Sequence, residues 1–261
     1  MSIVMRAIVT SITVTAMAPL CAFGIALLSG SANAAEIKVM CTPAFKEAYS
    51  ELVPSFEKSS GHKVVTIWAG TGEIMKRIGG GETVDLVILP AAMNEDLTKQ
   101  GRLVAGGSTA VAKSGVGIAV RAGAPKIDIS SGEALRRSLL AAKSIAYSSG
   151  PSGVYLAGLF QKWGIADQIK SKITQVPGGT AVGDVVARGD AEIGFQQVSE
   201  LLPIKGIDFL GPLPADIQET TVFSAALHTA ASAPDAAKAL VKFLTAPDAA
   251  AAIKKAGMQP G

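Results

Sequence analysis

Short apolar segments alternate with helical patterns along most of the chain, and this alternation constrains the fold more than any other feature. Residues 37–41 read as a strand. After it, Phe45, Tyr49, Leu52 and Phe56 recur at spacings of four, three and four, which places them on one face of a helix. The same order of strand and helix returns several times before the end of the chain. Such alternation is typical of parallel sheets covered by helices, so the sequence predicts an α/β fold.

The remaining expected elements follow the same pattern. Further strands are expected at 64–68, 84–89, 116–120, 145–147, 193–195 and 222–227. Helical patterns follow most of these strands. The last two helices are expected to begin near Pro234 and Pro247, because proline is tolerated in the first turn of a helix.

The first 34 residues are expected to be a signal peptide. Arg6 is the only charged residue among them, a long apolar run follows it, and Ser31-Ala32-Asn33-Ala34 matches the small-residue pattern of a cleavage site. A membrane anchor is the alternative interpretation, because the apolar run is long. We predict export to the periplasm and cleavage near Ala34.

Charge and composition argue against several classes of function. The chain has 24 basic and 21 acidic residues and no basic cluster, which gives no electrostatic basis for binding nucleic acid. Cys41 is the only cysteine beyond the predicted signal peptide, and His62 and His228 are the only histidines. An internal disulfide is therefore not expected, nor is a cysteine or histidine metal site. We expect no cofactor, no metal ion held directly by the protein and no nucleic-acid partner.

Four expected strands end in a polar or glycine-rich segment that opens a helix. These segments, called elbows here, are 41–44, 69–72, 149–153 and 178–180. In open α/β sheets, ligands bind beyond the carboxyl ends of strands, where backbone N–H groups and helix dipoles attract anions. The elbows therefore predict a shared site for a small anion. The alternative for each elbow alone is an ordinary strand-to-helix turn, which also favours Gly, Ser and Thr.

Several segments resemble the periplasmic molybdate-binding-protein family of ABC-transporter solute receptors. They are 38–52, 69–72, 84–88, 151–155 and 187–194. The resemblance implies a type II periplasmic binding fold with two α/β lobes, each a mainly parallel sheet flanked by helices. Two crossing segments would join the lobes, and the cleft between them would close around the ligand. The first lobe would take residues 35–114 and 222–261, and the second 115–221. The family also implies a monomer that delivers its ligand to the membrane permease of an ABC transporter.

The resemblance also implies the ligand-binding residues. They are Thr42, Ala44, Gly70, Thr71, Ser152, Gly153, Gly179, Thr180 and Gln197. The family usually has serine at the position of Ala44 and tyrosine at that of Gln197, so this chain lacks two donors of a tetrahedral-oxyanion cage. Glutamine offers both a donor and an acceptor. These differences favour an organic carboxylate over molybdate. A simple oxyanion held by backbone N–H groups remains the alternative.

We expect a solute-binding protein rather than an enzyme, with two alternatives. Some proteins resembling this family are periplasmic isomerases of unsaturated tricarboxylates such as aconitate, and that reaction needs a base near the substrate carbon. Cys41, Glu47, Glu73 and Asp184 lie near elbows, but charged residues in a first helical turn are typically surface groups that complement the helix dipole. No catalytic residue is assigned. A periplasmic sensor that signals to a membrane receptor is the other alternative.

Overall fold

The computed structural model describes residues 34–261. The predicted signal peptide lies outside the described residues apart from its last position. The described residues belong to one compact unit. Among them, no helix combines the length and apolar character that crossing a bilayer requires.

A ten-stranded mixed sheet organises the described chain, in the order β2-β1-β3-β9-β4-β7-β5-β6, with β8 and β10 each pairing with β4. The strands are β1 (Glu36–Cys41), β2 (Lys63–Trp68), β3 (Leu86–Pro90), β4 (Thr109–Arg121), β5 (Ile145–Ser148), β6 (Ile173–Val176), β7 (Ile193–Gln197), β8 (Ile207–Pro212), β9 (Thr220–Leu227) and β10 (Gln259–Pro260). β1 runs parallel to β2 and β3, and β5 runs parallel to β6 and β7. The predicted α/β class is confirmed, with antiparallel strands between the two parallel groups.

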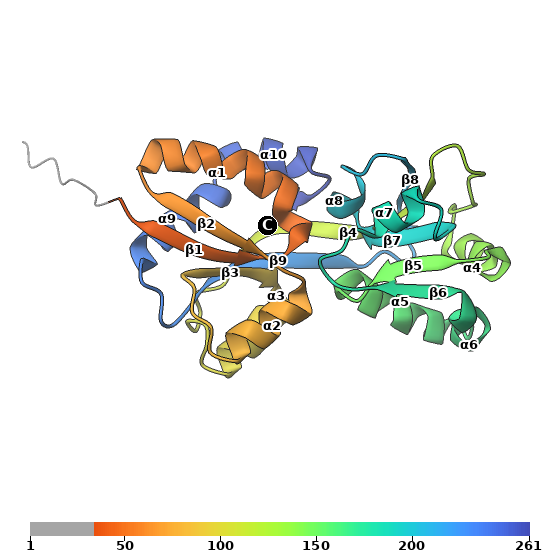
Figure 1. The fold of residues 1–261 in the computed structure, drawn as a ribbon, viewed down its shortest axis with the longest axis horizontal. Helices are drawn as coiled ribbons and strands as arrows, with labels where there is room; N and C mark the ends of the chain where they lie inside the picture. Colours follow the sequence, from red (N-terminus) through yellow and green to blue (C-terminus); the bar gives the residue numbers. More distant parts are fainter. Residues whose placement is uncertain (1–33) are drawn as a thin grey trace, which may run out of the picture. The chain divides into compact units, whose positions relative to one another are not determined.

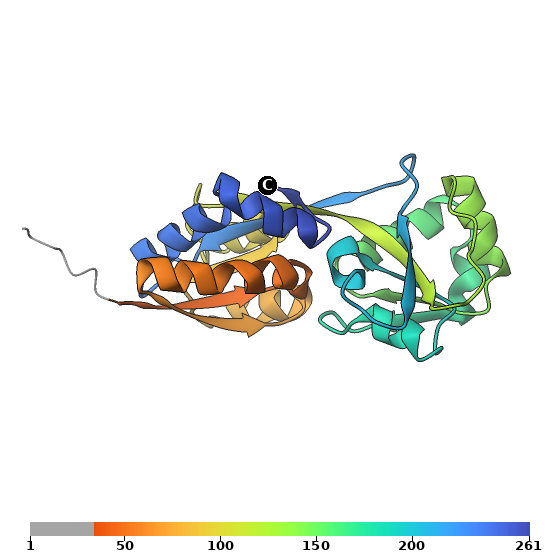
Figure 2. The ribbon, with the colours of Figure 1, turned by 90° about the horizontal axis from the view of Figure 1, so that it is seen from above.

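The long strand β4 belongs to both groups of strands. Its first part, Thr109–Gly115, pairs antiparallel with β9, and its second part, Val116–Arg121, pairs antiparallel with β7 and β8. Figures 1 and 2 show β4 and β9 running side by side from one group of strands to the other. The predicted lobe boundary after residue 114 lies where β4 changes partners. The division into lobes stays a prediction.

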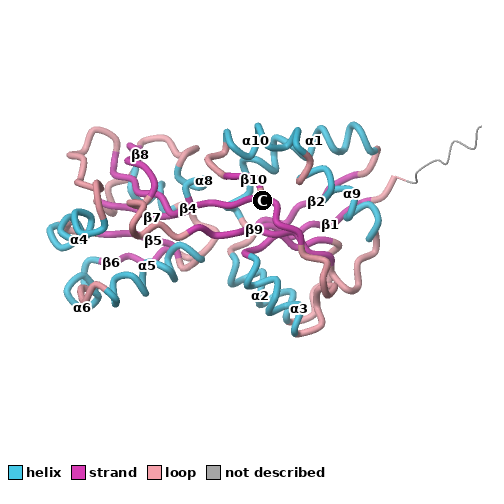
Figure 3. Tube along the Cα trace, turned by 180° about the vertical axis from the view of Figure 1, so that it is seen from behind, coloured by secondary structure: helices cyan, strands magenta, loops and turns pink. Residues whose placement is uncertain are grey.

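Helices flank both groups of strands (Figure 3). They are α1 (Lys46–Ser60), α2 (Thr71–Gly79), α3 (Ala91–Lys99), α4 (Gly132–Ala141), α5 (Pro151–Lys162), α6 (Ala166–Ile169), α7 (Val182–Ala187), α8 (Val198–Leu201), α9 (Pro234–Leu244) and α10 (Ala250–Lys255), with short 3-10 turns at Pro43–Phe45, Lys170–Lys172 and Pro247–Ala249. The apolar face predicted for the first helix is confirmed, because Phe45, Tyr49, Leu52 and Phe56 all join one buried cluster. That cluster fixes α1 and the elbow before it against the sheet.

Several elements differ from the sequence prediction. The strand expected at 116–120 begins seven residues earlier, at Thr109, because its first part pairs with β9. The strand expected from residue 84 begins at Leu86. Asp85, just before it, lies in a bend, where its carboxylate accepts hydrogen bonds from the backbone N–H groups of Lys38 and Ala233. Strands β8 and β10 were not expected, and each of them pairs only with β4.

Candidate functional site

Five strand-to-helix junctions converge on one cavity. The junctions follow β1 and β2 in one group of strands, and β5, β6 and β7 in the other. The cavity is lined by Thr42, Pro43, Ala44, Gly70, Thr71, Ser148, Gly150, Pro151, Gly178, Gly179, Gln196, Gln197, Glu200 and Phe223. No lysine or arginine occurs among these lining residues. Donors for an anion would therefore come from hydroxyls, amides and the N–H groups of first helical turns, which lack partners within their own helix.

Two elbows touch across the cavity. A Cβ atom added to Gly70 would lie 2.4 Å from the Gly178 carbonyl oxygen, a distance that no side chain tolerates. The residue after Gly178, Gly179, has a φ of 93°, a backbone conformation that favours glycine. Ser199 at the start of α8 also donates a hydrogen bond of 2.7 Å to the Ala44 carbonyl oxygen. These contacts close the cavity to about 20 Å³, roughly the space of a single water.

Gln196 fixes the position of Glu200 at the cavity. The Gln196 amide oxygen accepts a 2.8 Å hydrogen bond from the Val182 N–H at the start of α7. Its amide nitrogen donates to the Thr180 carbonyl oxygen at 3.2 Å and to Glu200 Oε1 at 2.8 Å. Because Gln196 is buried and both ends of its amide are engaged, the Glu200 carboxylate is held in one place.

Glu200 is an ionisable residue with an altered pKa. Burial raises its pKa from 4.5 to about 7, although hydrogen bonds from the Gln196 side chain and the Gln197 backbone act in the opposite direction. The residue as a whole is partly buried, and its neighbours exclude most of the water around the carboxylate. At neutral pH this group is therefore available both as an acceptor and, when protonated, as a donor.

Most of the predicted ligand-binding residues line this cavity. The residues that do so are Thr42, Ala44, Gly70, Thr71, Gly179 and Gln197. Ser152, Gly153 and Thr180 are not among the lining residues. The Ser152 hydroxyl lies 3.4 Å from that of Ser148, which does line the cavity.

The other two residues have local structural roles. A Cβ at Gly153 would collide with the Ser148 carbonyl oxygen, so glycine allows α5 to pack against the end of β5. Thr180 is exposed, and its carbonyl oxygen holds the Gln196 amide. Both residues therefore shape the elbows beside the cavity.

The Gln197 side chain points to β4 and β9, the two paired strands between the groups. Its amide lies 3.0 Å from the Thr221 hydroxyl, and the orientation that satisfies both ends places its nitrogen 3.1 Å from the Gly115 carbonyl oxygen. Gln197 therefore ties the end of β7 to both β4 and β9. With its amide engaged in this way, its side chain leaves no free donor equivalent to the family's tyrosine.

Sequence reasoning did not count the junction after β7 among the elbows, although the resemblance assigned Gln197 to the site. Residues 196–200 read Gln-Gln-Val-Ser-Glu, without the glycine or proline that marks the other elbows. The end of the expected strand beside Gln196 and Gln197 was the available signal, but the burial of Glu200 depends on contacts with residues far away in the sequence. Other lining residues that were not predicted are Pro43, Ser148, Gly150, Pro151, Gly178 and Phe223.

The four residues weighed as possible bases do not line the cavity. Cys41 is fully buried, and burial raises the pKa of its thiol well above the ordinary value. Glu73 is exposed and pairs with Arg77, and Asp184 is exposed. Glu47 is exposed and lines an adjoining chamber of about 160 Å³ that shares Gln196 and Glu200 with the cavity.

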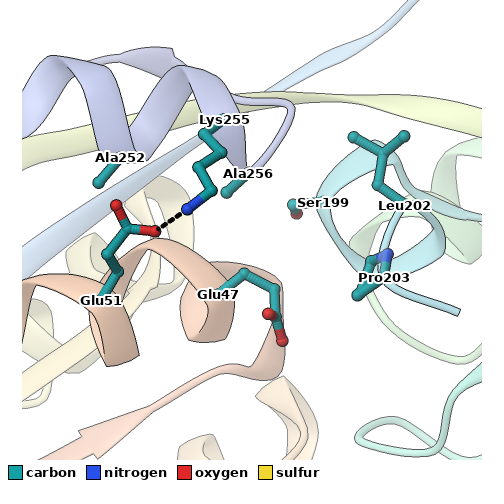
Figure 4. A pocket seen from close by; sticks show the side chains of 8 residues that line it. All are labelled: Glu47, Glu51, Ser199, Leu202, Pro203, Ala252, Lys255 and Ala256. Carbon is teal, nitrogen blue, oxygen red and sulfur yellow. Dashed lines mark hydrogen bonds and ion pairs between the residues drawn. The ribbon is translucent and has the colours of Figure 1, made fainter.

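A larger hollow of about 230 Å³ lies between α1, α8 and α10 (Figure 4). Its charged residues are Glu47, Glu51 and Lys255, and Lys255 pairs with Glu51 at 2.7 Å. With its one cation already paired, this hollow is less suited to an anion than the cavity between the elbows. Among residues 34–261, no cluster of three or more His, Cys, Asp or Glu is placed to hold a metal ion.

Comparison with known proteins identifies the family. The family described as bacterial extracellular solute-binding protein matches residues 37–259. The chain belongs to this family. In this solute-binding protein, the match includes every residue that lines the cavity.

Two curated relatives have different described activities. An aconitate isomerase from Pseudomonas sp. is 36% identical over 216 residues, covering 80% of this chain and 82% of the relative. The molybdate-binding protein ModA of Azotobacter vinelandii is 29% identical over 244 residues, covering 90% of this chain and 94% of the relative. Relatives of this chain therefore include one described as a binding protein and one described as an enzyme.

Solved structures support the fold. The periplasmic molybdate-binding protein of Azotobacter vinelandii superposes with a TM-score of 0.72 at 21% identity, covering 86% of this chain and 99% of that structure. The sulfate-binding protein SubI of Mycobacterium tuberculosis gives a TM-score of 0.64 at 18% identity, covering 87% of each chain. The predicted type II periplasmic binding fold and the resemblance to molybdate-binding proteins are confirmed.

Proposed function

We propose that this solute-binding protein captures a small organic carboxylate in the periplasm and delivers it to the permease of an ABC transporter. The cavity between the elbows would hold the ligand, and the lobes would part to admit it, because the present volume is too small for a multi-atom anion. The family supports capture and delivery, and the cavity supplies hydroxyl and backbone donors without a cationic side chain.

The observation that carries the choice of a carboxylate is Glu200 at the cavity wall. A fully ionised tetrahedral oxyanion offers acceptors alone, so it can pair with Glu200 only when that carboxyl is protonated and donates. Ala44 provides no hydroxyl, and the Gln197 amide is bound to the crossing strands. An organic acid offers hydroxyl donors and carboxylate acceptors, and Glu200 can pair with either.

Thermal unfolding of the purified protein with a panel of anions tests this proposal. The panel contains molybdate, tungstate, sulfate, phosphate, and di- and tricarboxylates that include both aconitates. A ligand present at a hundred times its Kd stabilises the folded state by about 2.7 kcal/mol. We expect this stabilisation with one or more carboxylates. Stabilisation by molybdate or tungstate alone would contradict the proposal.

Isomerisation of an unsaturated tricarboxylate is a second candidate function. Two observations favour it: the 36% identity to an aconitate isomerase, and a carboxyl group at the cavity with a pKa of about 7. A base with a pKa near the working pH could take a proton from the allylic carbon and return it to the other end of the shifted double bond. The substrate and product then have the same composition, and the base is regenerated.

Proton NMR in D₂O with each aconitate separately tests the second candidate. Isomerase activity would convert one isomer into the other, with the rate rising as pH increases through about 7 because the base must be ionised. Glu200→Gln should abolish that conversion. Binding without conversion at any pH would exclude this function.

A further inference from the structure

A single ionisable side chain lies where an anion would bind. Of the residues lining the cavity, Glu200 alone is acidic, and none is basic. In the adjoining chamber, Lys46 and Glu47 from the first turn of α1 are the other charged residues, and both are exposed. Their charges are opposite, so they do not replace the missing cation at the cavity.

Glu200 cannot move away from a bound anion without breaking its anchoring contacts. Gln196 holds Oε1 at 2.8 Å and is itself held by α7 and by the loop before it. Ser199, the preceding residue, is bonded to Ala44 across the cavity. Closing the cleft on an anion therefore brings the anion toward a fixed carboxyl group.

We propose that Glu200 is a specificity-determining residue: on closure it takes up one proton and donates a hydrogen bond to a carboxylate of the ligand. This inference rests on the proposed binding of an organic carboxylate. A bound anion favours the neutral form of a neighbouring carboxyl, and burial already raises the pKa of Glu200 to about 7. A protonated carboxyl then adds a donor to a site that lacks a cation, and a ligand without an acceptor at that position is disfavoured.

Isothermal titration with trans-aconitate as the probe measures the proton directly. The full-length gene product, purified after export, is titrated at about pH 8 in HEPES and in Tris, whose ionisation enthalpies differ. The difference in heat gives the protons taken up per ligand bound. We expect close to one for the wild type, and an affinity that falls about tenfold per pH unit between about pH 7 and pH 9.

Glu200→Gln and Glu47→Gln form a matched pair of variants. The glutamine at 200 keeps the shape of the side chain but cannot titrate, so its binding should be independent of buffer and of pH in this range. Glu47→Gln removes a carboxylate from the adjoining chamber and should retain the wild-type proton uptake. Circular dichroism and thermal unfolding confirm that both variants are folded.

The outcomes separate this inference from the proposed function. Binding of trans-aconitate by the wild type without proton uptake overturns the role of Glu200 and leaves carboxylate binding intact. Proton uptake that persists in Glu200→Gln overturns it as well. If no member of the carboxylate panel binds, the proposed function fails and this inference fails with it.

Discussion

Glu200 should make the stability of the protein depend on pH. Its pKa is about 7 in the folded chain against an ordinary value of 4.5, so the folded state holds the proton more tightly than the unfolded state. The resulting stabilisation is complete below about pH 4.5 and is lost as the pH rises through 7. The change in the free energy of unfolding caused by Glu200→Gln should therefore be about 1–2 kcal/mol more favourable at high pH than in acid, because glutamine carries no charge to desolvate.

Urea unfolding at about pH 4.5 and pH 8 measures this difference. Glu47→Gln is the control, since Glu47 is exposed and should show no comparable change between the two pH values. An equal effect of Glu200→Gln at both pH values would show that the carboxylate is not desolvated.

Ser148 at the end of β5 and Ser152 in the elbow that follows should contribute unequally to binding. Ser148 lines the cavity, whereas Ser152 is buried and does not line it, and the two hydroxyls lie 3.4 Å apart. Ser148→Ala should weaken ligand binding by about 1–2 kcal/mol, because a donor to a buried anion is lost. Ser152→Ala should weaken it less. Titration calorimetry of both variants with the same carboxylate checks this order, and a larger loss at Ser152 would reverse our assignment.

The elements beside the cavity were predictable where their signals are local. The pattern of a short apolar strand followed by Gly, Ser or Pro predicted the junctions after β1, β2, β5 and β6, because these residues favour tight turns and helix starts. The first part of β4 and all of β8 were missed because their pairing partners are distant in the sequence. Glu200 was missed for a similar reason. Helix α8 has only four residues, and its position depends on contacts with Gln196 and with Ala44 in the 3-10 turn after β1.

The elbow contact between Gly70 and Gly178 should control closure. Gly70→Ala places a Cβ against the Gly178 carbonyl oxygen and should hold the two elbows apart. We expect ligand affinity to fall at least tenfold, about 1.4 kcal/mol. Gly178→Ala is the matched control, because its Cβ would lie 3.5 Å from the nearest atom, the Ser149 hydroxyl oxygen, which is an ordinary contact. Equal affinities in the two variants, measured by titration calorimetry, would mean that this contact has no part in binding.

The strands β4 and β9 join the two groups of strands that surround the cavity. Gln197 bonds both of these strands at the end of β7. Gln197→Ala should lower the free energy of unfolding by about 1–3 kcal/mol, because buried partners on β4 and β9 lose a hydrogen bond. Gln168→Ala is the control, since its one hydrogen bond lies on the exposed surface of the second strand group. Urea unfolding compares the two, and similar losses would contradict a special role for Gln197.

Because β4 runs unbroken through both groups of strands, it restricts how the two groups can move. Sliding one group along the other would break the antiparallel ladder of β4 with either β9 or β7, whereas bending or twisting near Gly115 and Val116 leaves both ladders paired. Each opening and closing would then return the same elbow to the same opposite partner. A ligand would then meet the same set of contacts each time the cleft closes.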